Sequence, residues 1–235
     1  MSNLNSIQEL DLSDNAITSV GDGVFTGLRT LQRLNLSGNS FSSLNEFSFS
    51  GLSNLIELSV SNTGISVLDS SVLGRVTALR KLEASNNLLS DVPEDGLKEV
   101  LLLQTLDLSW NNISAVNATA LQLSVNLTTL NLTDNVITRI NSLAFGNTTI
   151  QTLLLSDNMI SEVPAAALGW ISATLRILSL SSNSLTSLAE SNFSGLALLG
   201  SLDLANNRLE SYPSSGFQLS NLTFLDLSGN SLPVD

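Results

Sequence analysis

Residues 103–113, near the middle of the chain, read LQTLDLSWNNI. Leu106 and Leu108 alternate with polar residues, which is the pattern of a short β-strand with one buried face. Asn111 follows, and its side-chain amide can both donate and accept hydrogen bonds where the backbone turns. This segment therefore predicts a short strand followed by a turn built around a buried asparagine.

The same pattern recurs along the chain at a nearly constant spacing. Its asparagine position returns every 24 residues, except for a step of 23 after Asn135, 25 after Asn158 and 23 after Asn207. A fixed period in this range indicates a solenoid of stacked repeats. We therefore expect a single array of ten repeats over residues 1–235, with strand motifs that start near residues 7, 31, 55, 79, 103, 127, 150, 175, 199 and 222. Thr63 replaces the asparagine in the third repeat, where we expect a local weakness and not a break.

The second half of each repeat carries an apolar spine. Phenylalanine or leucine recurs there, and stacked copies would bury a continuous core along the convex side. The spine positions are Phe25, Phe49, Leu73, Leu97, Leu121, Phe145, Leu168, Phe193 and Phe217. The irregular steps fall between the spine and the next strand, near residues 146–149, 169–174 and 218–221, so we expect the sheet to be undisturbed.

The combined motif, L-x-x-L-x-L-x-x-N-x-L-x-x-L-P-x-x-x-F-x-x-L-x-x, resembles the 24-residue extracellular type of the leucine-rich repeat family. Residues 31–49 and 199–217 match it well. The resemblance implies an α/β-type repeat solenoid, a curved horseshoe with a parallel sheet on the concave side and a mostly irregular or short-helical convex side. It also implies similarity to the ectodomain arrays of Toll-like receptors, Slit-type proteins and variable lymphocyte receptors.

Composition argues against several classes of function. The net charge is −12 at pH 7, with 9 Lys and Arg against 21 Asp and Glu, so clustered cations for binding nucleic acid are lacking. The chain has no histidine and no cysteine, which removes Ser-His-Asp triads, thiol nucleophiles and ordinary zinc sites. Asp203 and Asp226 fall on neighbouring predicted strands, where two carboxylates could form a catalytic pair or bind calcium weakly. They are more simply explained as solvated acids on an exposed sheet. We predict that the chain is not an enzyme and has no cofactor, no metal and no membrane insertion.

The family resemblance implies that each end of the repeat array would be covered by a capping segment. Extracellular members usually carry disulfide-bonded caps, and this chain has no cysteine. We interpret it as an excised segment, an engineered array or an uncapped member, and we expect self-association through uncapped ends.

Eight Asn-x-Ser/Thr sequons favour an extracellular or cell-surface protein, although a chain this rich in asparagine and serine contains about as many by chance. Asn35 and Asn131 would lie on the concave sheet, where a glycan would obstruct binding, and Asn126 and Asn221 follow from the repeat pattern. The candidate glycosylation sites are Asn112, Asn117, Asn147 and Asn192.

Equivalent positions of stacked repeats form columns on the predicted concave face. The third column begins with Glu9, Arg33, Glu57 and Lys81, which we interpret as a charge ladder across the strands. The fifth column is mostly acidic, and the eighth is mostly Asp, Asn or Gly. Four apolar residues depart from this polar pattern: Trp110, Leu154, Ile177 and Phe224.

Leu154 and Ile177 lie on adjacent repeats and adjacent columns, so we expect their side chains to touch. Exposed apolar clusters mark interaction sites more often than scattered single residues do. For the other two, a structural interpretation stays open: Trp110 could lie against the turn, and Phe224 could cover the C-terminal end.

We therefore predict a non-enzymatic recognition module that binds a protein or peptide through the concave face. The predicted contact residues are Leu154, Ile177, Trp110, Phe224, Asp107, Asn131 and Glu83. The alternative is a structural or engineered repeat scaffold with no native ligand.

Overall fold

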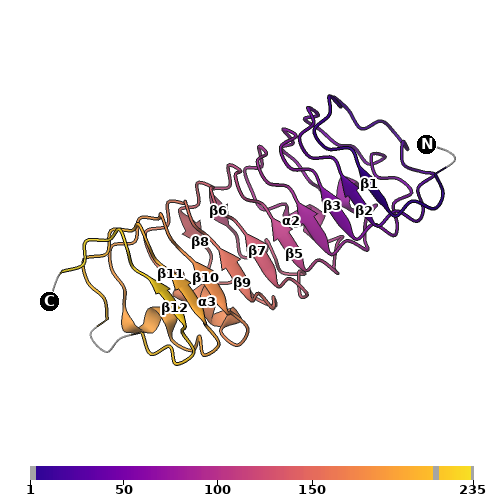
Figure 1. Cartoon of the computed structure of the whole chain (residues 1–235). Helices are drawn as coiled ribbons and strands as arrows, with labels where there is room; N and C mark the ends of the chain where they lie inside the picture. The colour runs from indigo at the N-terminus through magenta and orange to yellow at the C-terminus, as the bar shows by residue number, and fades with distance from the viewer. Residues whose placement is uncertain (1–3, 214–216, 234–235) are drawn as a thin grey trace.

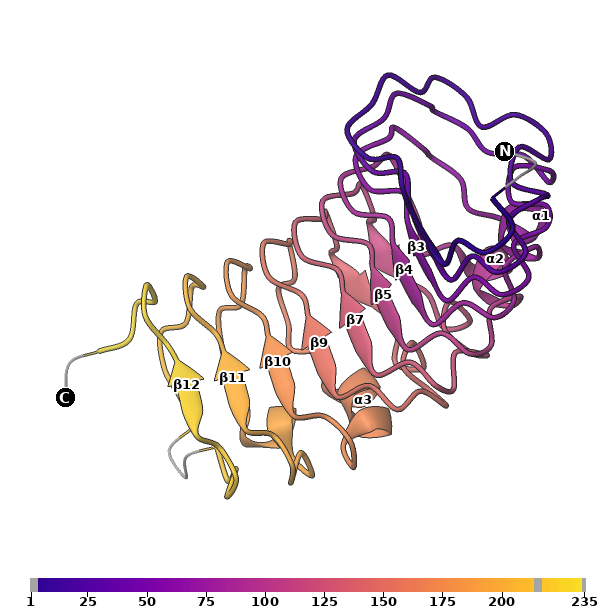
Figure 2. The same ribbon diagram turned by 45° about the vertical axis from the view of Figure 1, so that its right-hand side comes forward.

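A ten-stranded parallel sheet runs the length of the molecule in the computed structural model, which describes residues 4–213 and 217–233. Figures 1 and 2 show a curved, elongated coil with the chain ends at its two extremities. The strands follow one another in chain order: β1 (Glu9–Asp11), β2 (Arg33–Asn35), β3 (Glu57–Ser59), β4 (Lys81–Glu83), β5 (Thr105–Asp107), β7 (Thr129–Asn131), β9 (Thr152–Leu154), β10 (Ile177–Ser179), β11 (Ser201–Asp203) and β12 (Phe224–Asp226).

Equivalent residues of neighbouring repeats are paired throughout the sheet. Leu106 pairs with Leu130 between repeats of regular length. The same register holds across the irregular steps, where Leu130 pairs with Leu153 and Leu153 with Leu178. The prediction that the irregular steps leave the sheet undisturbed is therefore confirmed.

The convex side consists of turns and short helices, as the family resemblance predicted, and of one short two-stranded sheet. Its helices are α1 (Ser70–Leu73), α2 (Glu94–Leu97), α3 (Ala165–Leu168), the 3₁₀ helix η1 (Gly169–Ile171) and the 3₁₀ helix η2 (Glu190–Phe193). A two-stranded parallel sheet joins β6 (Ala115–Val116) to β8 (Arg139–Ile140). In Figure 2, α1, α2 and α3 lie on the side of the coil away from the ten-stranded sheet. The longest repeat step is accommodated by α3 and η1.

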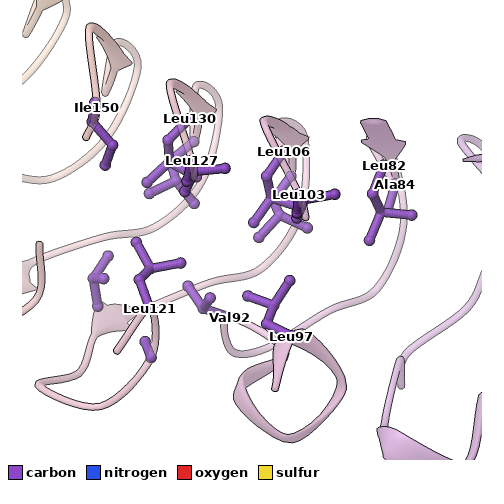
Figure 3. Close-up of a cluster of buried hydrophobic side chains, with 14 of the residues drawn as sticks. Leu82, Ala84, Val92, Leu97, Leu103, Leu106, Leu121, Leu127, Leu130 and Ile150 are labelled. Carbon is purple, nitrogen blue, oxygen red and sulfur yellow. The ribbon is translucent and has the colours of Figure 1, made fainter. Parts of the chain in front are cut away.

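The core lies between the sheet and these outer segments. Figure 3 shows Leu106 and Leu130 from the sheet pointing toward Leu97 and Leu121 from the outer side. All four side chains are fully or almost fully buried. Because each buried leucine contributes about 1.5–3 kcal/mol, burial between neighbouring repeats supplies most of the stabilisation. The equivalent Leu225 of β12 is 39% exposed.

An asparagine ladder links each repeat to the one before it. The side-chain nitrogen of Asn39 donates to the carbonyl of Leu36 in its own repeat at 2.8 Å and to that of Leu12 in the preceding repeat at 2.9 Å. Its side-chain oxygen accepts from the Ile17 amide at 3.0 Å. The predicted role of this position, satisfying turn backbone in stacked copies, is confirmed.

Thr63 interrupts this ladder. Its hydroxyl donates to Val60 O and to the side-chain oxygen of Asn87, at 2.9 and 3.1 Å. Neither bond reaches the preceding repeat, and the buried Phe41 amide, the equivalent of the Ile17 amide, finds no hydrogen-bond acceptor within the described residues. Strands β2 and β3 still pair in register. Hydrogen bonding therefore changes locally without breaking the solenoid.

Candidate functional site

The concave face is formed by side chains that alternate with the buried strand leucines. In β5, Leu106 is buried, whereas Thr105 and Asp107 on either side of it face outward and are half-buried. The same alternation holds in the neighbouring strands, so the third and fifth positions of the repeats form two parallel columns. The seventh and eighth positions extend this surface into the turn that follows each strand.

The first four repeats carry the ion pairs of this face. Arg33 pairs with Glu9 and lies 3.9 Å from Glu57. Lys81 pairs at 2.6 Å with Glu83 on its own strand. Lys81 stands opposite Glu57 in the β3–β4 register, so the charges alternate across the strands as predicted, but the ion pair of Lys81 is to Glu83 and not to Glu57. The hydrogen bond that Lys81 donates to Glu83 holds the pKa of Lys81 above its usual value, with smaller contributions from the charges of Glu57 and Asp107.

We call the outward positions of repeats 1–4 the N-terminal half of the concave face, and those of repeats 5–10, from β5 to β12, the C-terminal half. A shallow depression of about 250 Å³ lies in the N-terminal half, lined by Glu9, Asp11, Arg33, Glu57 and Glu83 among others. Glu83, a predicted contact residue, thus lies in the ion-paired half.

The C-terminal half has a different charge pattern. No Lys or Arg occupies its third, fifth, seventh or eighth positions. Within the described residues, all ion pairs fall between Glu9 and Lys98, so none reaches this half. Desolvation, together with the nearby charge of Asp157, raises the pKa of Asp134. The carboxylates of this half are Asp107, Asp134, Asp157, Asp203 and Asp226.

All four apolar departures from the repeat pattern lie in this half. Trp110 is 61% exposed, Phe224 is 51% exposed and Ile177 is 42% exposed, while Leu154 is half-buried. The alternative interpretations, that Trp110 lies against the turn and that Phe224 covers the C-terminal end, stay predictions.

Leu154 and Ile177 lie diagonally on adjacent strands. Ile177 pairs with Thr152 and Leu154 with Ser179 across the β9–β10 ladder. Diagonal neighbours in a sheet are about 7–8 Å apart and remain within reach of long side chains. The predicted contact between the two side chains stays a prediction.

The fifth column also has a structural role that the sequence analysis missed. A side-chain oxygen of Asp107 accepts from the Ser109 amide at 2.9 Å and from its hydroxyl at 2.6 Å. Asn131 accepts from the Thr133 amide at 3.1 Å. These Asx turns close the strand ends, and their signal is an Asp or Asn followed two residues later by a residue whose amide needs an acceptor.

Leu154 cannot make this turn. It stands at the fifth position but has no side-chain acceptor, and the Ser156 amide has no hydrogen-bond partner in the described part of the chain. Leu154 therefore replaces a residue type that would stabilise the strand end.

The eighth column is uniformly left-handed, which sequence reasoning also missed. Its φ angles lie between 51° and 68° in all ten repeats. Asp, Asn and Gly tolerate this conformation, and their predominance in the column was the available signal. Trp110 has φ 54°, an unfavourable conformation for a bulky side chain. Strain of this kind gathers at functional sites.

The candidate glycosylation sites differ in their surroundings. Asn112, Asn117 and Asn147 are exposed outside the concave columns. Asn192 is half-buried, and its side-chain oxygen accepts from the Ala189 amide at 2.7 Å.

Family models match most of this architecture. The model described as leucine rich repeat matches residues 5–65, 31–89 and 173–232. The chain belongs to the leucine-rich repeat family. A second model, the BspA type leucine rich repeat region, matches residues 68–168. The repeats on both sides of the central segment thus fit the general leucine-rich repeat pattern.

Relatives and solved structures share parts of this leucine-rich repeat array. Tsukushi-A of Xenopus laevis is 48% identical over 59 residues, which are 25% of this chain and 17% of that protein. The crystal structure of TLR13 in complex with ssRNA13 superposes with a TM-score of 0.88 and 26% identity, over 97% of this chain and 33% of TLR13. A leucine-rich repeat protein of Leptospira interrogans gives a TM-score of 0.87 and 28% identity, over 98% of this chain and 57% of that one.

The matched segments thus span 17% of Tsukushi-A, 33% of TLR13 and 57% of the Leptospira protein. Across the residues that the structure describes, no helix has the length and apolar content needed to cross a membrane.

Proposed function

We propose that this chain is a non-enzymatic recognition module, part of an extracellular receptor or adhesion protein, that binds a protein or peptide through the C-terminal half of its concave face. One observation carries the proposal. Trp110, Leu154, Ile177 and Phe224 all stand in that half, at positions where the repeat pattern otherwise places polar residues. Asp107 and Asn131 border them in the fifth column.

Two of these residues also conflict with their local structure. Leu154 lacks the side-chain acceptor that an Asx turn needs, and Trp110 has a left-handed backbone conformation. Conflicts between a residue and its local structure are expected where function, and not folding, selects the residue. This supports a contact role for both side chains.

The charge of the surface favours a protein or peptide over nucleic acid. TLR13 was solved with single-stranded RNA. In this chain the C-terminal half of the concave face carries carboxylates and no cations. Phosphate binding relies on Lys and Arg, and this surface would repel a polyanion.

An extracellular location is proposed from the sequons. Asn112, Asn117 and Asn147 are exposed and lie away from the concave columns, so glycans there would leave the proposed contact surface open. TLR13 contains a similar array over 33% of its chain, within a larger protein.

The test compares this chain with a variant that restores the repeat pattern. Leu154→Asn reintroduces the residue found at Asn131, and Ile177→Thr the residue found at Thr152. Affinity capture from a defined library of extracellular proteins should yield a partner that the double variant loses. Leu101→Asn is the matched control, because Leu101 is 48% exposed but lies outside the concave columns. Equal capture by the double variant would refute this site.

A scaffold that associates with itself is the second candidate. Its supporting observation is that Leu225, in the last strand of the sheet, is 39% exposed although its counterparts in β2 to β11 are buried. Sedimentation should then show association that rises with concentration and is weakened by Leu225→Lys. A monomer at all concentrations would argue against this candidate.

A further inference from the structure

We propose that the ligand of the C-terminal half is a basic segment in the polyproline II conformation, which places an apolar side chain against Leu154 and Ile177 and a cationic side chain on each side of it, against Asp107 and Asp203. This inference rests on the proposed function and names the chemistry of its ligand.

Uncompensated charge is the first argument. In the N-terminal half, Arg33 and Lys81 pair with neighbouring acids. In the C-terminal half, five carboxylates form no ion pair within the described residues, and only Asp107, at the border, is close enough to a cation, Lys81, to act on its pKa. A concave surface of one sign attracts a partner of the opposite sign and raises its rate of association.

The order of residues in the fifth column is the second argument. Starting from Asp107 in β5, the paired residues are Asn131 in β7, Leu154 in β9, Ser179 in β10 and Asp203 in β11. Leu154 therefore lies two strands from each aspartate. Neighbouring strands are about 4.8 Å apart, so each aspartate is roughly 9.6 Å from the apolar position.

This spacing selects a backbone conformation. A polyproline II helix has three residues per turn and a rise of about 3.1 Å, so every third side chain points the same way at intervals of about 9.3 Å. In a β-strand, side chains three residues apart point to opposite faces. A segment of the form basic-x-x-apolar-x-x-basic matches the column as polyproline II and not as a strand.

The aspartates have oxygens available for a cation. The Asx turn at Asp107 uses one oxygen, and the other oxygen forms no hydrogen bond with the described residues. Asp203 accepts from Ala205 with one oxygen and from the Ser179 hydroxyl with the other. A carboxylate has about four lone-pair sites, so both groups can still accept from an arginine.

Trp110 supplies the aromatic surface that such ligands use. It follows Asp107 by three residues and is 61% exposed. Polyproline II segments dock on aromatic side chains, and an arginine can also stack on an indole.

The probe is the fluorescein-labelled peptide Arg-Pro-Pro-Leu-Pro-Pro-Arg, titrated with the full chain and followed by fluorescence anisotropy. Replacing both arginines by glutamate, or the leucine by serine, should each weaken binding by about tenfold or more. Moving the leucine by one position should also weaken binding, because the side chains then no longer match the column. Raising the salt concentration should weaken only the arginine-containing peptides.

The protein variants change charge while keeping the turn. Asp107→Asn and Asp203→Asn retain an oxygen for the Asx turn, as Asn131 does. Each should weaken binding of the arginine peptide about two- to fivefold. The matched control is Asp11→Asn in the N-terminal half, because Asp11 makes the same turn with Ser13. That variant should bind normally.

Three results would overturn the inference. Equal binding of the arginine and glutamate peptides, with loss only in Leu154→Asn, would remove the basic ligand while the proposed function stood. Failure of every peptide to bind the full chain would refute the polyproline II ligand. The proposed function would then still be tested by the protein-capture experiment. A single-stranded RNA oligonucleotide that bound and was lost in the Leu154→Asn variant would replace a basic ligand by a nucleic acid.

Discussion

Thr63 directs its hydroxyl forward to Asn87, at 3.1 Å, and not back to the preceding repeat. The same side-chain oxygen of Asn87 also accepts from the Gly64 amide at 2.9 Å. In regular repeats the amide after the ladder residue bonds to backbone of the preceding repeat, as Ser40 does to Ile17. The junction between the second and third repeats therefore lacks bonds that other junctions have.

Thr63→Asn should repair this junction. An asparagine would offer an acceptor to the buried Phe41 amide and a donor to the Leu36 carbonyl, which should raise the free energy of unfolding by about 1 kcal/mol. Urea denaturation followed by circular dichroism measures this. The reverse change, Asn135→Thr, should lower the free energy of unfolding by about 1–3 kcal/mol. Equal stability in all three proteins would mean that the ladder does not hold neighbouring repeats together.

Trp110→Asn should separate stability from binding. Asparagine tolerates the left-handed conformation, and the exposed indole buries little surface, so the free energy of unfolding should rise by about 1 kcal/mol. Partner binding should weaken in the same variant. The opposite exchange in the neighbouring repeat, Asn86→Trp, should cost a similar amount of stability. A less stable Trp110→Asn protein would show that the indole packs against the turn.

Asp69 should make the stability of α1 depend on pH. Its hydrogen bond with the Ser71 hydroxyl lowers the pKa of the carboxyl, and the Val72 and Ser71 amides act in the same direction. Because the folded pKa lies below the unfolded one, the stabilisation is fully present above the ordinary value of 3.8 and is lost as the pH falls through the folded pKa. NMR titration of the carboxyl carbon measures the shift.

Two variants check the cause of that shift. Ser71→Ala should move the pKa of Asp69 back toward its ordinary value. Asp69→Asn should retain the cap and reduce the loss of stability below about pH 4. A titration of Asp69 at its ordinary pKa in the unmodified protein would contradict the hydrogen-bonding account.

Glycan occupancy should follow exposure. When the chain is secreted from animal cells, we expect glycans at Asn112, Asn117 and Asn147, which are exposed and make no side-chain hydrogen bond within the described residues. Asn192 should remain largely unmodified, because it is half-buried and caps η2. Mass spectrometry of glycosidase-treated peptides measures occupancy at each site. Full occupancy at Asn192 alone would contradict the expectation.

The fold was predictable from the sequence because nearly every repeat carries the same signals for its strand and its turn. Alternating leucines such as Leu106 and Leu108 locate each strand, and the asparagine spacing sets the register between strands. The extents of α1 and α3 were not predictable, because short convex segments depend on local caps and on the length of each repeat. Asn45 and Asn141, at the position of Asp69 in their repeats, accept the same bond from the amides of Phe47 and Leu143, yet the described residues that follow them form turns and not an α-helix.

The candidate site was predictable only in part. Columns read from the sequence place Trp110 and Leu154 on the concave face, and the Asp, Asn and Gly of the eighth column carry the signal of its left-handed backbone. The columns do not reveal side-chain direction. The ion pair of Lys81 with Glu83, in place of one with Glu57, depends on side-chain torsion angles. These details distinguish structural residues from residues available to a ligand.

The constant register across repeats of unequal length has a consequence for how such an array changes over time. Residues can be gained or lost in the convex segments, as happens between Leu130 and Leu178, while the strand residues stay aligned. Insertions on the convex side of the coil thus leave the strand positions on the concave side unchanged. Repeat length can drift, be trimmed or be engineered independently of the residues that a partner would contact.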